Sequence, residues 1–168
     1  MVTNFHELYQ KYAQDIYRFA YWLCGNAQDA EDITSETFVR ALTASGEIKS
    51  ETVKGYLLTI AKNLAYKKSN REKRFVPLSA EVTEPIIGPA HTAENSDSLQ
   101  TAMRFIQTLP EVDRAALVLR LQDNLSYEEI ASVLNISLAA AKVKVHRARL
   151  KLTEHMHQQE EPPNENHP

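Results

Sequence analysis

The sequence predicts an all-α protein made of two small helical domains joined by a flexible linker, the second domain having four helices. Apolar residues recur every three or four positions along most of the chain. Only four glycines occur among 168 residues, too few for an architecture of tight turns between strands. Three prolines interrupt the stretch 77–97, which has no sustained period. We therefore expect domains at 1–76 and 98–156, the linker at 77–97, and a disordered polar tail at 157–168.

The first domain contains three predicted helices. Residues 5–24 carry an apolar stripe that stops at Gly25, where a helix C-cap fits. Residues 27–42 begin with several acids and have a cation near their end, which matches the helix dipole. A polar loop at 43–52 then leads to a third helix over residues 52–75. The acidic face of the second helix is either a solvated surface or a docking site for a basic partner.

The third predicted helix is basic in its C-terminal half. Between Lys54 and Arg74, seven cations stand against one acid, although the whole chain has a net charge of −3. Such a local concentration of cations favours contact with a polyanion. Tyr56 lies about one turn before the basic C-terminal half of this helix, so its ring can stack on an unpaired base while the cations hold the backbone. Ordinary packing in the core explains this tyrosine equally well.

The second domain ends in the pattern of a helix-turn-helix. Two helices are predicted first, at 98–108 and at 110–122. The next helix starts at Ser126, an N-cap candidate with acids behind it. A turn at Asn135 leads to a final helix that Ser137 can cap, with apolar positions repeating by three and four.

The final predicted helix has a basic face, and no acid lies between Ser137 and Thr153. Ala139, Val143 and Arg147 lie opposite its apolar stripe and are expected to face a DNA groove, with Arg147 as the best candidate for a base contact. The flanking cations expected to meet phosphates are Lys142, Lys144 and Arg149. A solvated amphipathic helix is the simpler alternative, and the capped turn before the helix weighs against it.

No residue pattern indicates a catalytic, metal or cofactor site, and no small-molecule substrate is expected. The six histidines lack HExxH or CxxC-type spacing, and no GxxxxGK[ST] phosphate loop is present. The single cysteine, Cys24, lies in an apolar run and is expected to be a buried thiol. No apolar run of about 18 residues and no secretory signal occurs, so we expect a cytoplasmic protein without membrane insertion.

Several stretches resemble the extracytoplasmic-function (ECF) group of bacterial sigma factors. The segment DAEDITSETFVRAL is similar to the family's signature for docking on core RNA polymerase. The stretch VKGYLLTIAKNLAYKKSNR is similar to the helix that melts and reads the −10 promoter region. The segment LPEVDRAALVLRLQDNLSYEEIASVLNISLAAAKVKVHRAR is similar to the −35-reading domain, and it is the most specific match because LP, SYEEIA, IS and HRAR all stand at the family spacing.

The resemblance implies a promoter-specificity subunit without an active site, whose partners are core RNA polymerase, promoter DNA and an anti-sigma factor. The residues implied for polymerase docking are Asp29, Asp32, Ser35, Glu36 and Phe38. Those implied for the −10 region are Tyr56, Lys62, Asn63, Lys67, Lys68 and Arg71. Those implied for the −35 element are Ala139, Ala140, Lys142, Val143, Lys144, Arg147 and Arg149. The loop at 43–52 would receive a flipped-out base.

The chain departs from the family pattern within each of these sets. Ser35 stands where glutamine is common, Tyr56 where tryptophan is common, and Lys67 where aspartate is frequent. In the recognition helix, Ala140 and Val143 replace hydroxyl residues, which shifts readout toward apolar contact with thymine methyl groups. The preferred −35 sequence therefore need not be the family's usual one.

Two other functions are compatible with the same residues. A repressor or activator could carry the helix-turn-helix without docking on polymerase, and co-purification with core polymerase separates it from a sigma factor. A pure interaction module or adaptor would bind no DNA even at low salt, where phosphate contacts are strongest. An enzyme needs convergent reactive groups, and the sequence offers none.

Overall fold

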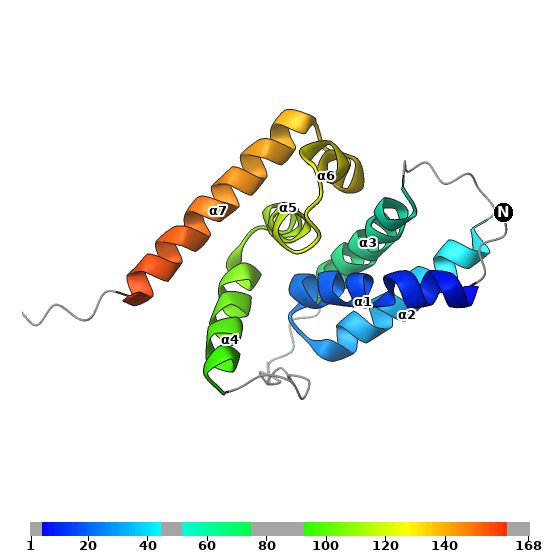
Figure 1. Cartoon of the computed structure of the whole chain (residues 1–168), viewed down its shortest axis with the longest axis horizontal. Coiled ribbons are helices and arrows are strands. Elements are labelled where there is room, and N and C mark those ends of the chain that lie inside the picture. The colour runs from blue at the N-terminus through cyan, green and yellow to red at the C-terminus, as the bar shows by residue number, and fades with distance from the viewer. Residues whose placement is uncertain (1–4, 45–51, 75–92, 161–168) are drawn as a thin grey trace, which may run out of the picture.

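The computed structural model describes residues 5–44, 52–74 and 93–160, and within these ranges it contains seven α-helices and no strand (Figure 1). The N-terminal unit consists of α1 (Phe5–Cys24), α2 (Ala27–Thr43) and α3 (Val53–Arg74). The C-terminal unit consists of α4 (Ala93–Thr108), α5 (Glu111–Leu121), α6 (Tyr127–Leu134) and α7 (Leu138–Glu160). The all-α prediction is confirmed.

The turn between α1 and α2 forms where glycine and asparagine were expected to end the first helix. Gly25 has a φ of 78°, which glycine adopts without the steric cost that a side chain would add, and its amide donates to the carbonyl of Tyr21 at 2.8 Å. Asn26 then caps α2, since its side-chain oxygen accepts from the amide of Asp29 at 2.8 Å. The two helices are thereby joined by a short, hydrogen-bonded connection.

Each unit buries large apolar side chains contributed by several helices. The largest fully buried apolar side chains of the N-terminal unit are Ile16, Phe19, Phe38, Leu57 and Leu58. Those of the C-terminal unit are Leu117, Leu119, Ile130 and Val145. The central element is α5, which contacts α1 of the other unit as well as α6 and α7 (Figure 1). The buried residues of both units form one continuous cluster.

The two units pack against one another through two sets of helices. The start of the C-terminal unit, α4 and α5, lies on α1, and α6 lies on α3. The end of the predicted linker belongs to α4, because this helix begins at Ala93 and residues 93–97 are therefore helical. Residues 77–92 lie outside the described residues, so the expected flexibility stays a prediction.

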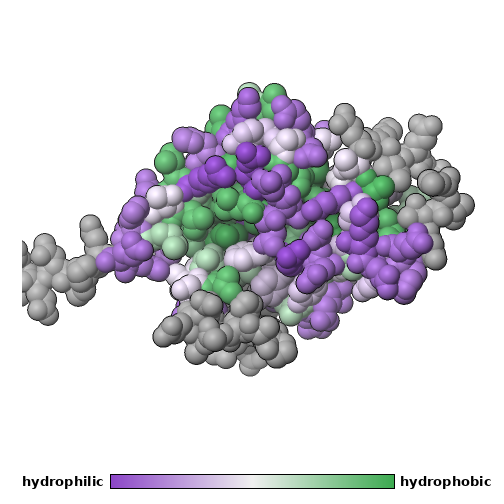
Figure 2. Space-filling view, viewed as in Figure 1, coloured by the Kyte–Doolittle hydropathy of each residue, from purple (hydrophilic) through white to green (hydrophobic). Residues whose placement is uncertain are grey.

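The last helix is longer than the sequence pattern indicates. The sequence predicts disorder from residue 157, whereas α7 continues to Glu160. The rest of the expected tail, 161–168, lies outside the described residues. On the face drawn in Figure 2, hydrophobic residues gather in a hollow between α4 and α7. In the ranges the structure describes, none of the helices is both long and apolar enough to span a membrane.

Candidate nucleic-acid interface

The helix-turn-helix predicted near the C-terminus forms with a complete set of caps. Ser126 and Glu129 make a reciprocal capping box, in which the Glu129 amide donates to Ser126 Oγ at 3.1 Å and the Ser126 amide donates to Glu129 Oε2 at 2.8 Å. Asn135 ends α6 in the left-handed conformation, with φ 53°. Ser137 Oγ then accepts from the Ala140 amide at 3.1 Å and starts α7. These local bonds fix the angle at which α7 leaves α6.

Small residues seat α7 on the C-terminal unit. Ala141, Val145 and Ala148 are buried and repeat by four and three, so one stripe of the helix faces α5 and α6. The opposite side is open to solvent. The predicted −35 residues that are exposed are Ala139, Lys142, Val143, Arg147 and Arg149, and Ala140 is half-buried. Two of the exposed positions can offer apolar contacts, and the cations lie around them.

Lys144 differs from its predicted position, because its ammonium group points toward the protein. Its side chain is 27% exposed, and Nζ lies 3.2 Å from Oδ1 of Asp113, a residue of α5 that is 2% exposed. The reason is its place on the helix, three residues after Ala141 and next to Val145, at the edge of the buried stripe. As a result, Lys144 is held by an internal carboxylate in this structure.

The predicted −10 residues are spread over three environments along α3. Asn63, Lys67 and Arg71 are exposed, and Tyr56 and Lys68 are half-buried. Lys62 is only 6% exposed, with its Nζ 5.7 Å from the centre of the Tyr66 ring, and burial lowers the pKa of this lysine. The side chain of Lys62 is thus packed inside the protein and does not line the surface with its neighbours. Residues 45–51 of the loop expected to receive a flipped base lie outside the described residues.

The predicted docking residues of α2 divide in the same way. Asp32, Ser35 and Glu36 are exposed, and because Ser35 and Glu36 follow Asp32 by about one turn, both lie on its face of the helix. Phe38 is 1% exposed and packs against Tyr9, with ring centres 5.0 Å apart. Phe38 therefore belongs to the hydrophobic core, so it has no surface to offer a docking partner in this arrangement.

The acidic face of α2 and the basic face of α3 meet along one open groove. The groove is lined by side chains of both helices, among them Asp32, Glu36, Lys67 and Arg71. Lys68 pairs with Asp29 and lies 3.8 Å from Asp32, so one predicted −10 cation is bound by two predicted docking acids. Burial alone would lower the pKa of Lys68, but the hydrogen bond and charge of Asp29 outweigh it and raise the pKa.

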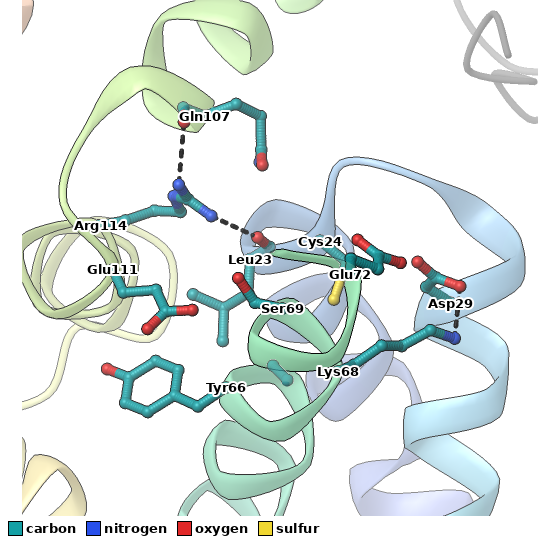
Figure 3. Close-up of a pocket in the computed structure, with 11 residues that line it drawn as sticks. Leu23, Cys24, Asp29, Tyr66, Lys68, Ser69, Glu72, Gln107, Glu111 and Arg114 are labelled. Carbon is teal, nitrogen blue, oxygen red and sulfur yellow. Dashed lines mark hydrogen bonds and ion pairs between the residues drawn. The ribbon is translucent and has the colours of Figure 1, made fainter. Parts of the chain in front are cut away.

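Sequence reasoning missed the polar contacts that join the two units, and Figure 3 shows one of them, between Arg114 and Leu23. Arg114 of α5 donates to the carbonyl of Leu23 at 2.8 Å and thus satisfies the C-terminal end of α1. Gln107 donates to the carbonyl of Trp22 at 2.8 Å, and Lys54 lies 3.3 Å from the carboxylate of Asp123. No sequence motif marks these residues, because their partners are backbone carbonyls or acids far away in the chain.

A cavity of about 340 Å³ lies beside these contacts and is lined by both units. Cys24 is one of its lining residues, and burial, followed by the charge of Asp29, raises the pKa of this thiol to about 12. Burial also raises the pKa of the neighbouring Tyr66. Across the described ranges, no group of three or more histidine, cysteine or acidic side chains is placed to hold a metal ion.

Comparison with known families and proteins gives a consistent result. The family described as Sigma-70 region 2 matches residues 8–75, and the family described as Sigma-70, region 4 matches residues 99–152. The ECF RNA polymerase sigma factor SigE of Mycolicibacterium smegmatis is 33% identical over 166 residues, a match that covers 92% of this chain and 62% of that protein. This chain thus spans less than two thirds of that relative's length.

A second relative is covered almost completely. The ECF RNA polymerase sigma factor SigM of Bacillus subtilis is 31% identical over 151 residues, with 87% of this chain and 91% of that protein covered. Among solved structures, the sigma factor RpoE in complex with the anti-sigma factor NepR from Bartonella quintana has a TM-score of 0.75 and 26% identity, with 91% of this chain and 96% of that chain covered. The helical units, the capped helix-turn-helix and these matches show that the chain belongs to the ECF group of RNA polymerase sigma factors.

Proposed function

We propose that this chain binds core RNA polymerase and directs it to specific promoters, with α3 melting and reading the −10 region and α7 reading the −35 element. It acts in the cytoplasm as a specificity subunit and has no active site of its own. The observation that carries the proposal is the outer face of α7, which presents exposed cations around two exposed small or apolar residues on a rigidly capped helix-turn-helix.

The proposed −35 contact follows from the geometry of α7. Arg147 is 54% exposed on the side away from the buried stripe, so its guanidinium can reach base edges in a major groove. Lys142 and Arg149 lie on one flank of that side, where they can neutralise phosphates. The methyl groups of Ala139 and Val143 suit thymine methyl groups.

The proposed −10 contact uses fewer side chains than the sequence pattern indicates. Asn63, Lys67 and Arg71 follow one another at intervals of four residues on the exposed side of α3, a spacing that keeps them on one face. Cations in such a row can follow the backbone of a single strand, and the half-buried Tyr56 offers a ring at the other end of the helix. Lys62 and Lys68 are assigned no direct contact in this arrangement.

The proposed polymerase contact is the exposed acidic face of α2 around Asp32, Ser35 and Glu36. This surface distinguishes a sigma factor from a repressor with the same helix-turn-helix, since a repressor needs no polymerase-binding unit. The match of residues 8–75 to Sigma-70 region 2 favours the sigma factor. An anti-sigma factor is also proposed as a partner, because the related RpoE structure is a complex with the anti-sigma factor NepR.

Transcription in vitro with purified core polymerase on a genomic DNA library, followed by mapping of the start sites, tests the proposal. We expect start sites that depend on this protein and share −10 and −35 elements. Glu36→Lys serves as the control variant that should lose polymerase binding. Its side chain is exposed, so the replacement should abolish this binding without unfolding the helix. Start sites that are identical with and without the protein would overturn the proposed function.

A further inference from the structure

Asp113 is a buried acid that no sequence motif singled out, and it lies under the DNA-facing helix. It belongs to the first turn of α5, where the positive end of the helix dipole favours a carboxylate. Its Oδ1 accepts a hydrogen bond from Lys144 Nζ at 3.2 Å, and its Oδ2 lies 3.9 Å from Arg147 Nη1. Oδ2 has no hydrogen-bond partner among the described residues. Both cations that face this carboxylate therefore come from α7.

We propose that Asp113 is a positioning residue for −35 recognition, which neutralises Lys144 internally and orients Arg147 toward the base edges. The proposal rests on the function proposed above. A carboxylate that is 2% exposed needs compensating charge, and Lys144 supplies it at hydrogen-bond distance. An ammonium held in this way is withdrawn from the phosphates, so α7 carries one cation fewer toward DNA than its sequence contains.

The role of Arg147 differs from that of Lys144. Nη1 of Arg147 lies 3.9 Å from Oδ2 of Asp113, which is close enough for charge attraction and too long for a hydrogen bond. Just over half of the Arg147 side chain stays exposed. Bidentate recognition of a base requires the guanidinium plane to be held in one orientation. A charge on one side of the group restrains that plane and leaves the other edge free for the groove. Asp113 thus favours specific over non-specific contact.

Two effects of opposite sign distinguish this role from simple structural support. Removing the charge of Asp113 frees Lys144 for the phosphates, so affinity for DNA lacking the −35 sequence rises at low salt. The same change loosens Arg147, so discrimination between matched and scrambled −35 elements falls. A variant that merely damaged the helix-turn-helix would lose both kinds of binding together.

The experiment measures binding of the reconstituted holoenzyme to a mapped promoter and to the same duplex with a scrambled −35 element, over a series of salt concentrations. For Asp113→Asn we expect the logarithmic salt slope on the scrambled duplex to steepen by about 0.9, the value for one added phosphate contact. Preference for the matched element should fall roughly five- to tenfold, within the range for one base contact. The double variant Asp113→Asn with Lys144→Gln should return to the wild-type slope.

Two single variants keep the test decisive if Asp113→Asn fails to fold in thermal melting. Lys142→Gln removes an exposed cation from α7 and should make the slope shallower by about 0.9, whereas Lys144→Gln should leave it nearly unchanged. Equal effects of these two variants would overturn the inference, as would an Asp113→Asn variant that folds and keeps the wild-type slope and preference. A wild-type holoenzyme without preference for any mapped promoter would instead overturn the proposed function. In that case, the salt slopes on the scrambled duplex would still show whether Asp113 keeps Lys144 away from the phosphates.

Discussion

The cations of the two basic helices, α3 and α7, differ in exposure and in ion pairing. In α7, Lys142, Arg149 and Lys151 are exposed and form no ion pair with any residue in the described ranges. Arg147 stays exposed although it lies 3.9 Å from Asp113, and the ammonium group of Lys144 points inward. In α3, the first basic residue, Lys54, lies near two acids, Lys62 is buried, and Lys68 pairs with α2. Two helices that are both rich in lysine and arginine therefore offer unequal surfaces to a nucleic acid.

The difference follows from where each helix lies. Both α1 and α2 cover α3 on one side, and α6 covers it on another, so several of its cations meet acids or apolar groups. The outer helix α7 rests mainly on α5 and α6 and leaves its far side open (Figure 1). The number of cations in a sequence is thus only an upper limit on those at the surface, and packing determines how many of them a ligand can reach.

The largest expected effect concerns the core of the N-terminal unit. Phe38→Ala should lower the free energy of unfolding by roughly 3–5 kcal/mol, because it empties a fully buried site. Chemical denaturation measures this loss. The adjacent Val39 is 53% exposed, so Val39→Ala is the matched control and should cost less than about 0.5 kcal/mol. Similar losses for the two variants would contradict the assignment of Phe38 to the core.

The single cysteine reports on the junction between the units. Because the pKa of Cys24 is about 12 instead of 9.0, little thiolate forms at pH 9, and alkylation of the folded protein should be slower than in urea by on the order of 10²- to 10³-fold. A raised thiol pKa also means that the unfolded chain releases its proton first, so stability should decline as the pH rises from about 9 to about 12.

Arg114→Ala removes the contact to the end of α1 and should speed alkylation by allowing the units to separate. The rate with iodoacetamide, followed by mass spectrometry, provides the measurement. A folded wild-type protein that reacts as fast as the unfolded chain would show that the junction does not protect Cys24.

The caps of the helix-turn-helix give a smaller effect. Ser126→Ala should cost about 1 kcal/mol of stability, since it leaves the amide of Glu129 without its capping acceptor. Ser132→Ala, at an exposed position inside the same helix, is the matched control and should be neutral or slightly stabilising. Thermal melting compares the two, and an equal response would argue against the capping box as the element that fixes α6.

The smallest expected effect separates two neighbouring lysines of α3. Lys67→Gln should change the salt dependence of holoenzyme binding to single-stranded DNA that carries the −10 sequence. The logarithmic salt slope should become shallower by about 0.7, as expected for one lost phosphate contact. Lys68→Gln should change the slope little, because Asp29 and Asp32 already neutralise that ammonium. Matching changes for both lysines would mean that the comparison between α3 and α7 is wrong.

Sequence reasoning located the helices well because their signals are local. Gly25, Ser126 and Asn135 act through their own backbone neighbourhood, and the helix ends and turns formed where these residues stand. The sequence predicts a shorter α7 because the polar, histidine-containing segment from residue 157 has the composition of a disordered tail. The early start of α4 was missed for a similar reason, since residues 93–97 are polar and follow a proline-rich stretch.

Assignment of surface residues from the sequence was less complete. A helical wheel correctly separates Arg147 from Ala141, and it fails for Lys144 because the deciding partner, Asp113, is 31 residues away. The resemblance implies contact roles for Phe38 and Lys62 by position, and only the packing of other helices reveals that both are buried. Long-range partners of this kind leave no periodic signal in one sequence.

The most direct test of promoter reading by α7 combines Arg147→Ala with base-pair substitutions across the −35 element of a mapped promoter. Loss of the Arg147 side chain should weaken holoenzyme binding by roughly 1–3 kcal/mol. At one base pair, substitution should weaken binding by the wild-type protein and have almost no effect on Arg147→Ala, because the two changes remove the same contact. Losses that simply add at every base pair would contradict the account.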